Sequence, residues 1–322
     1  MRAKLAPLLA AAAVAAICVT GGAARPAGWS YASPTWSPDG RELVFASARG
    51  PAGELLVVRA GNRTVRRIAK APIISQAAWS PDGARIAFVS RGRVFLVHRD
   101  GSGRRSLGRG AAIVWAPDSG HLAFDVGGQG GIRVVTAEGA GAHAVTTGSF
   151  DRAPSWSPDG GRLVFSRAAT AAGAEALFTV DRDGGTAAPL GIQGADASWS
   201  PAGGRLAFWR TGADGVSLVV AGLDGADAVA ITRSLPAYSG PARWSPDGSR
   251  LAFTVCSAFG ACRVDIADTS GSDVLILGSG GEPSWAPDGA RIAFAARRSC
   301  RSSSVFTVRA DGGGLARLTP CR

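Results

Sequence analysis

Short apolar runs separated by turn residues recur along the chain from about Ser30 onward. The run Arg85–Phe88 and its counterpart Arg291–Phe294 each combine apolar side chains with bounding Gly, Pro and Asp residues. A second apolar run follows each of them, at Val94–Val97 and Val305–Val308. Short apolar segments between turn clusters are typical of strands, so the pattern predicts a succession of short antiparallel strands.

One phrase organises this pattern: Trp-Ser-Pro-Asp-Gly, two variable residues, an apolar residue, a small or apolar residue and Phe. Its seven copies start 36 to 45 residues apart; those at Trp115, Trp199 and Trp285 differ from it in one or two of these positions, and Pro never varies. They begin at Trp36, Trp79, Trp115, Trp156, Trp199, Trp244 and Trp285. Ser, Pro and Gly in this order suit a type I turn between two strands. We predict that the seven Trp residues form the structural core between repeats, where truncation of a large buried side chain costs ~3–5 kcal/mol.

Each repeat continues with a third apolar segment and a tight turn. Asp and Gly stand together in several of these turns, for example at Asp100 and Gly101 or Asp311 and Gly312, and this dipeptide is a strong hairpin signal. Four short strands in a period of ~40 residues are typical of one propeller blade. The predicted fold class is all-β: a seven-bladed β-propeller over residues 30–322 with four antiparallel strands per blade. The blades are expected to begin near residues 31, 74, 111, 151, 194, 239 and 280.

The repeated phrase, followed by an Asp-Gly hairpin, resembles the TolB-type, WD-repeat-like propeller repeat. The resemblance extends from about Ser30 to Arg322 and implies a propeller that binds a partner. TolB-type proteins carry a six-bladed propeller behind an N-terminal α/β domain, whereas this chain has seven copies and no predicted segment for such a domain before Trp36. The Trp-Asp dipeptide of true WD repeats is also missing. The resemblance therefore does not extend to the role of TolB in the Tol–Pal envelope system.

The first residues predict export. Arg2 and Lys4 precede the apolar run Leu5–Val19, and the small residues Gly21–Ala24 follow it. A basic start, an apolar middle and a small-residue exit are the parts of a secretory signal peptide, predicted here over residues 1–24. The apolar run is shorter than the ~20 residues that span a bilayer. An extracytoplasmic location, secreted or periplasmic, is expected; a retained anchor and surface attachment stay open.

The formal net charge of the chain is +11. A basic excess can indicate nucleic-acid binding. Here the arginines are distributed over all repeats rather than gathered in one run, and an exported protein meets little nucleic acid. We therefore expect no nucleic-acid partner.

Four cysteines follow the predicted leader: Cys256, Cys262, Cys300 and Cys321. An even number in an oxidising compartment predicts disulfides, and four cysteines allow three pairings. Proximity within the blades favours the pairs Cys256–Cys262 and Cys300–Cys321. Metal binding is the weaker interpretation because no Cys-x-x-Cys pair occurs, and no metal or other cofactor is expected.

The sequence contains no recognisable catalytic constellation. It lacks both a Gly-x-Ser-x-Gly nucleophile elbow and a His-Glu-x-x-His motif. Its three histidines are His98, His121 and His143. Some polysaccharide lyases use related propellers with a histidine-bound metal, which leaves a lyase-like enzyme acting at the mouth of the central channel as the alternative hypothesis.

Alternating strand directions divide the loops between two faces. The Ser-Pro-Asp-Gly and Asp-Gly turns share one face and are uniform, whereas the loops of the other face vary, and function on repeat scaffolds usually lies on such loops. Aromatic residues and Arg are enriched at binding hot spots. The candidate binding residues of this variable-loop face are Phe150, Asp151, Arg152, Asp196, Trp209, Arg210, Tyr238 and Glu282.

The leading functional hypothesis is a non-enzymatic, monomeric binding scaffold that uses the variable-loop face and the central channel. Its partner is expected to be a protein, a peptide or a cell-envelope glycan. For Trp209 the alternative interpretation is that it covers a hydrophobic edge.

Overall fold

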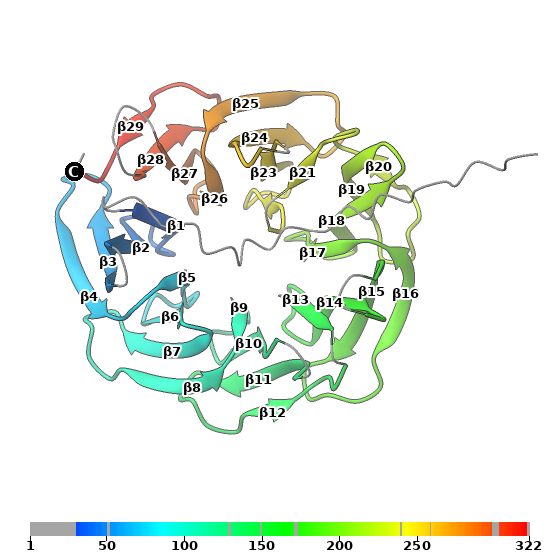
Figure 1. Cartoon of the computed structure of the whole chain (residues 1–322), viewed down its shortest axis with the longest axis horizontal. Helices are drawn as coiled ribbons and strands as arrows, with labels where there is room; N and C mark the ends of the chain where they lie inside the picture. Colours follow the sequence, from blue (N-terminus) through cyan, green and yellow to red (C-terminus); the bar gives the residue numbers. More distant parts are fainter. Residues whose placement is uncertain are drawn as a thin grey trace, which may run out of the picture.

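The computed structural model describes residues 30–49, 52–127, 130–148, 150–170, 173–238, 240–257, 259–297 and 303–320. These residues form seven antiparallel sheets arranged as blades around a common axis (Figure 1), which confirms the predicted seven-bladed β-propeller. The predicted signal peptide over residues 1–24, as well as Cys300 and Cys321, lie outside the described residues. Within the described ranges, no helix is long and apolar enough to cross a membrane.

Each blade takes its strands from one continuous segment. The innermost strands are β1 (Ser30–Trp36), β5 (Ile74–Trp79), β9 (Ala111–Trp115), β13 (Asp151–Trp156), β17 (Ala195–Trp199), β21 (Ala237–Tyr238) with β22 (Arg243–Trp244), and β26 (Gly281–Trp285). The second strands are β2 (Glu42–Arg49), β6 (Arg85–Ser90), β10 (His121–Asp125), β14 (Arg162–Ala168), β18 (Arg205–Gly212), β23 (Arg250–Cys256) and β27 (Arg291–Ala296). In blade 6 the innermost strand is divided, and both of its parts pair with β23.

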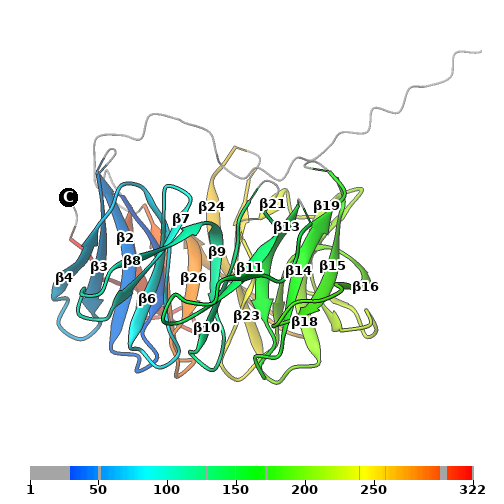
Figure 2. The ribbon, with the colours of Figure 1, turned by 90° about the horizontal axis from the view of Figure 1, so that it is seen from below.

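The outer half of each blade is built in the same order. The third strands are β3 (Ala52–Arg59), β7 (Arg93–His98), β11 (Ile132–Thr136), β15 (Glu175–Asp181), β19 (Gly215–Gly222), β24 (Cys262–Asp268) and β28 (Ser304–Arg309). The outermost strands are β4 (Val65–Lys70), β8 (Arg105–Arg109), β12 (His143–Ala144), β16 (Ala188–Gln193), β20 (Val229–Ala230), β25 (Val274–Ser279) and β29 (Ala316–Arg317). The strands run between the two faces of a thick disc (Figure 2), which places the two kinds of loop on opposite faces.

The repeated Ser-Pro-Asp-Gly phrase closes the turn between the first two strands. In blade 1 the hydroxyl of Ser37 donates to Asp39 at 2.5 Å and accepts from the backbone N–H of Glu42 at 2.9 Å. In six of the seven turns the last position is a Gly with positive φ, which a side chain would disfavour, and this Gly lies against the Pro of the preceding blade; in blade 3 the position is Ser119, also with positive φ. Gly83 faces Pro38 in this way, and Gly40 faces Pro287 across the junction of the last and first blades. The phrase therefore shapes a turn and also joins neighbouring blades.

The hydrophobic core consists of seven clusters, and each cluster lies between two adjacent blades. The Phe that ends each phrase is fully buried. Of the repeated tryptophans, Trp199 and Trp244 are half-buried and the other five are buried. Several of their indole N–H groups donate to a carbonyl of the preceding blade, as Trp156 does to Val114 at 3.1 Å.

Blades 7 and 1 close the ring without sharing a strand. Trp36 and Phe45 of blade 1 pack against Ala293 and Val305 of blade 7. The guanidinium of Arg291 lies over the Trp36 ring, 5.7 Å from its centroid. Because neither sheet combines strands from both ends of the described chain, closure depends on these side-chain contacts.

Candidate binding site at the ring axis

A bulge interrupts the pairing near the start of most innermost strands. Three residues before the repeated Trp, the backbone adopts the left-handed conformation in five blades, and the pairing register shifts at the same place. These residues are Ser33, Ala112, Ala153, Asp196 and Glu282, with φ between 44° and 57°. Bulges of this kind re-aim a side chain and are common beside functional sites. In blades 5 and 7 the re-aimed side chain is a carboxylate.

Each acidic bulge is held by the blade before it. The backbone N–H of Asp196 donates to the hydroxyl of Ser166 at 2.9 Å, and that of Glu282 donates to the hydroxyl of Thr254 at 3.1 Å. The Glu282 carboxylate in turn accepts from the backbone N–H of Ser33 at 2.5 Å, which ties blade 7 to blade 1. Both carboxylates are thus attached to rigid strands, which preorganises them for a ligand.

These two acids belong to a larger polar group that we call the axial cluster. Its members interact electrostatically with one another and come from blades 3 to 7. They are Asp125, Arg152, Glu175, Asp196, Tyr238, Arg243 and Glu282. Carboxyl groups outnumber guanidinium groups in the cluster, although the chain as a whole is strongly basic.

Arg152 organises the centre of the axial cluster. Its guanidinium donates two hydrogen bonds to the carboxylate of Glu175 on the third strand of the same blade. This hydrogen bonding raises the pKa of Arg152, and the nearby Asp196 carboxyl acts in the same direction. Bidentate pairs of this type are among the strongest polar contacts in proteins, so Arg152 is held in one orientation.

Asp196 lies in a protein-lined environment. Burial raises its pKa above the ordinary value of 3.8, while Arg152 and a hydrogen bond from the Tyr238 hydroxyl oppose that rise. Burial and the neighbouring Asp196 also raise the pKa of Tyr238, so its hydroxyl stays protonated and can donate. Asp125 shows the same effect: it is buried, its pKa is raised by desolvation, and it accepts from the N–H of Ala153 at 3.4 Å.

Tyr238 is positioned by Trp209. The two rings stack with centroids 4.4 Å apart, and the indole N–H of Trp209 donates to the carbonyl of Gly240 at 3.1 Å. Only 1% of Trp209 is exposed, so its ring cannot serve as a direct contact for a partner. The structure therefore corrects the placement of Trp209 among contact residues: it covers the hydrophobic edge beneath Tyr238, the alternative that the sequence left open.

Arg243 is the cluster member with the least satisfied charge. Within the described part of the chain, no hydrogen bond or ion pair reaches its guanidinium. The side chain is exposed, yet it sits among the innermost strands, and desolvation lowers its pKa while Glu282 and Asp196 raise it. A guanidinium carries five N–H donors, so Arg243 on an innermost strand is suited to bind carbonyl or carboxylate oxygens of a ligand.

The other predicted residues lie on the same face but outside the axial cluster. Asp151 is buried and receives two hydrogen bonds from Arg167, at 2.6 and 2.8 Å, so its carboxylate is already paired. Phe150 is half-buried beside it. Arg210 is exposed, and its guanidinium lies over the Phe208 ring, 5.4 Å from the centroid.

Sequence reasoning missed Asp125, Glu175 and Arg243. Two of them stand out once the repeats are aligned. The position before the repeated Trp holds a small or apolar residue in every blade except blade 6, where it is Arg243. The position ten residues after the Trp is acidic only in blade 3, at Asp125. Glu175 carries no such signal, because the loop before it differs in length between blades.

The cluster combines carboxyl groups, guanidinium groups and a tyrosine hydroxyl, which can donate and accept hydrogen bonds. Among the described residues, no group of three or more His, Cys, Asp or Glu side chains is placed to hold a metal ion. His98, His121 and His143 all lie at turns of the opposite face, where they contact Ser102, Asp118 and Gly141 respectively. The arrangement can bind a polar ligand that presents basic groups together with carbonyl oxygens.

The raised pKa of Asp196 gives a testable pH dependence. Because the folded state holds this proton more tightly than the unfolded state, Asp196 favours folding below about pH 3.8 and loses that contribution as the pH rises through its folded pKa. Asp196→Asn removes the effect. We expect the free energy of unfolding of the wild type to increase relative to that of the variant as the pH falls from about 7 to about 4. Urea denaturation of both proteins across this range measures the difference. If the free energy of unfolding changes with pH equally in both proteins, the raised pKa of Asp196 is contradicted.

Comparison with known sequences identifies related proteins. The family model described as TolB beta propeller domain matches residues 24–203, which is more than half of the chain. The Tol-Pal system protein TolB of Anaeromyxobacter dehalogenans is 40% identical over 89 residues, covering 26% of this chain and 20% of that protein. The matched segment therefore spans about a fifth of that relative.

Solved structures share the architecture. TolB from Acinetobacter baumannii aligns with a TM-score of 0.58 and 19% identity, covering 80% of this chain and 66% of that one. The oligogalacturonate lyase from Vibrio parahaemolyticus aligns with a TM-score of 0.66 and 13% identity, covering 86% and 89%. At these identities the likeness shows the propeller fold alone, because one fold hosts many functions.

Proposed function

The chain belongs to the TolB beta-propeller domain family, and from this premise we propose that it is an exported, non-enzymatic protein that binds a partner polypeptide at the axial cluster. The observation that supports the proposal most directly is that the solvent-exposed Arg243 and Glu282 interact electrostatically, through Asp196, with the hydrogen-bonded Arg152–Glu175 pair. Preorganised polar groups on rigid strands are suited to recognition, because little ordering is needed on binding.

A polypeptide matches the chemistry of this cluster better than a polyanion. Arg243 can donate to backbone carbonyls, and the exposed carboxylate of Glu282 can accept from N–H groups or a basic side chain. The excess of carboxyl over guanidinium groups disfavours an acidic polysaccharide and favours a partner with Lys, Arg or a free amino terminus. The proposed extracytoplasmic location rests on the signal peptide predicted over residues 1–24.

Arg243→Gln tests the proposal without removing a structural contact. The purified protein, incubated with envelope extract and cross-linked, is expected to capture a partner that the variant captures at least ten times less efficiently, since ~1.4 kcal/mol corresponds to tenfold. Arg309→Gln provides the matched control: it makes the same change of charge on the opposite face, where Arg309 pairs with Asp311. Mass spectrometry of the captured material measures the ratio.

Two results would count against the proposal. Equal capture by the wild type and Arg243→Gln, with unchanged thermal unfolding, would remove the axial cluster from the interface. Cleavage of uronate-containing polysaccharide by the wild type, followed through the absorbance of the unsaturated product, would instead support the lyase-like alternative.

A further inference from the structure

The loop between β23 and β24 presents an aromatic side chain to solvent. Six large hydrophobic side chains are exposed among the described residues; five of them expose 39–57% of their surface, whereas Phe259 exposes 98%. A side chain this exposed buries almost no apolar surface on folding, whereas Phe is enriched at interfaces because it offers a large apolar surface. This residue therefore needs a different explanation from the partly covered ones.

A disulfide and two hydrogen bonds link described residues on the two sides of the loop. Cys256 and Cys262 are opposite one another at the ends of β23 and β24 and form a disulfide, as the sequence predicted. Inside the loop, the N–H of Ser257 donates to the carbonyl of Ala261 at 2.7 Å, and the N–H of Gly260 donates to the carbonyl of Ser257 at 3.0 Å. A side chain carried on a closed loop loses little conformational freedom on binding, which raises affinity.

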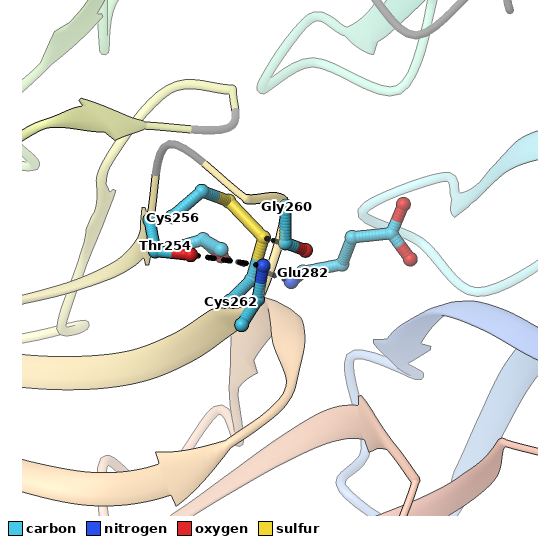
Figure 3. Close-up of a disulfide and its surroundings, with 7 residues drawn as sticks. Thr254, Cys256, Gly260, Cys262 and Glu282 are labelled. Atoms are coloured by element: carbon cyan, nitrogen blue, oxygen red, sulfur yellow. Dashed lines mark hydrogen bonds between the residues drawn. A yellow bond between two sulfur atoms is a disulfide. The ribbon is translucent and has the colours of Figure 1, made fainter.

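The disulfide-closed loop between β23 and β24 lies next to residues of the axial cluster. Cys256 pairs with Ala237, and Val255 pairs with Tyr238, so the loop begins next to the tyrosine of the cluster. On its other side, Cys262 accepts from the N–H of Gly280, and Thr254 accepts from the N–H of Glu282. Figure 3 shows the disulfide next to Glu282, whose side chain extends away from it. The loop that carries Phe259 is thus connected to the axial cluster through two innermost strands, β21 with Tyr238 and β26 with Glu282.

We propose that Phe259 is the hydrophobic anchor for the partner polypeptide: an apolar residue of the partner contacts the ring while a nearby basic residue enters the axial cluster. The inference rests on the proposed function and specifies its ligand class. Charge complementarity selects the occupant, because the adjoining cluster carries more carboxyl than guanidinium groups. Interfaces commonly combine such an aromatic anchor with polar contacts at its rim.

A phage-displayed library of random 12-residue peptides, selected on the wild-type protein, supplies the probe. The selected peptides are expected to share an apolar residue close to a Lys or Arg. Phe259→Ser is expected to weaken their binding by about tenfold, which is the size of one anchor contact. Ile276→Ser is the matched control, since Ile276 is an exposed apolar residue of the same blade on β25, outside the loop. Its binding is expected to equal that of the wild type.

A double-mutant cycle separates the anchor from the rest of the site. When the apolar residue of a selected peptide is replaced by Ser, the wild type and Phe259→Ser should bind the altered peptide equally. Opening the loop with Cys256→Ser and Cys262→Ser should weaken the original peptide several-fold while thermal unfolding stays cooperative, because β23 and β24 remain paired.

The possible outcomes distinguish this inference from the proposed function. Peptides that lose binding with Arg243→Gln but bind Phe259→Ser normally would overturn the anchor and leave the axial cluster as the binding site. Failure to select any peptide would overturn both. Sedimentation with phosphatidylglycerol vesicles that disappears in Phe259→Ser, without peptide binding, would assign the ring to a lipid surface and likewise overturn the inference.

Discussion

Phe45→Ala is expected to lower the free energy of unfolding by about 3–5 kcal/mol, a large part of the stability of an ordinary domain. The Phe45 side chain is fully buried and packs in the cluster between blades 7 and 1. Its truncation leaves a cavity in the junction where no strand is shared between sheets. Denaturation in urea, monitored by tryptophan fluorescence, measures the loss.

The matched variant is Phe165→Ala, because Phe165 occupies the same repeat position and is equally buried between blades 3 and 4. A similar loss of stability is expected, but the local consequences should differ. Blades 3 and 4 remain connected through the chain, whereas blades 7 and 1 are held by side-chain packing. Hydrogen exchange should therefore accelerate in β1 and β26 for Phe45→Ala and stay local for Phe165→Ala. The same pattern in both variants would contradict the view that the closing junction is the weak one.

Arg152→Ala is expected to have the second-largest effect, about 3 kcal/mol of lost stability together with loss of partner binding. Its removal leaves the Glu175 carboxylate, which is 12% exposed, without its bidentate partner. It also removes the positive charge that stabilises the ionised form of Asp196. Calorimetry at neutral pH measures the first effect. Arg210→Ala is the control, since this exposed arginine is expected to cost less than about 1 kcal/mol.

The double variant Arg152→Ala and Glu175→Ala checks the physical reason. If the loss arises from an unpaired buried charge, removing both partners should cost less than the sum of the single changes. Strict additivity would show that the stability comes from packing of the two side chains rather than from their pairing.

The sequence was sufficient for the repeat architecture because the signals are local and occur seven times. The turn keeps Pro in every copy and favours Ser, Asp and Gly around it, and the strand that follows needs apolar residues in register with it. The Cys256–Cys262 disulfide was predictable for the same reason, since a hairpin places residues so close in sequence opposite one another.

The axial cluster was only partly visible. Asp196, Arg152, Tyr238 and Glu282 were identified as residues of one face, but their mutual contacts depend on how blades 4 to 7 pack. The exposure of Trp209 was misjudged because its environment is set by Tyr238 in the next blade, which no pattern within one repeat records.

The sequence by itself therefore determined the number of blades, the strands of each blade and the face that carries the variable loops, because these follow from turn chemistry and from short-range periodicity. Only the tertiary structure decided which charges meet at the axis and which aromatic ring is buried or exposed. The reason is physical: Asp125, Asp196 and Arg243 are far apart along the chain, and the interactions that link them through Asp196 arise only when seven sheets pack side by side in a ring.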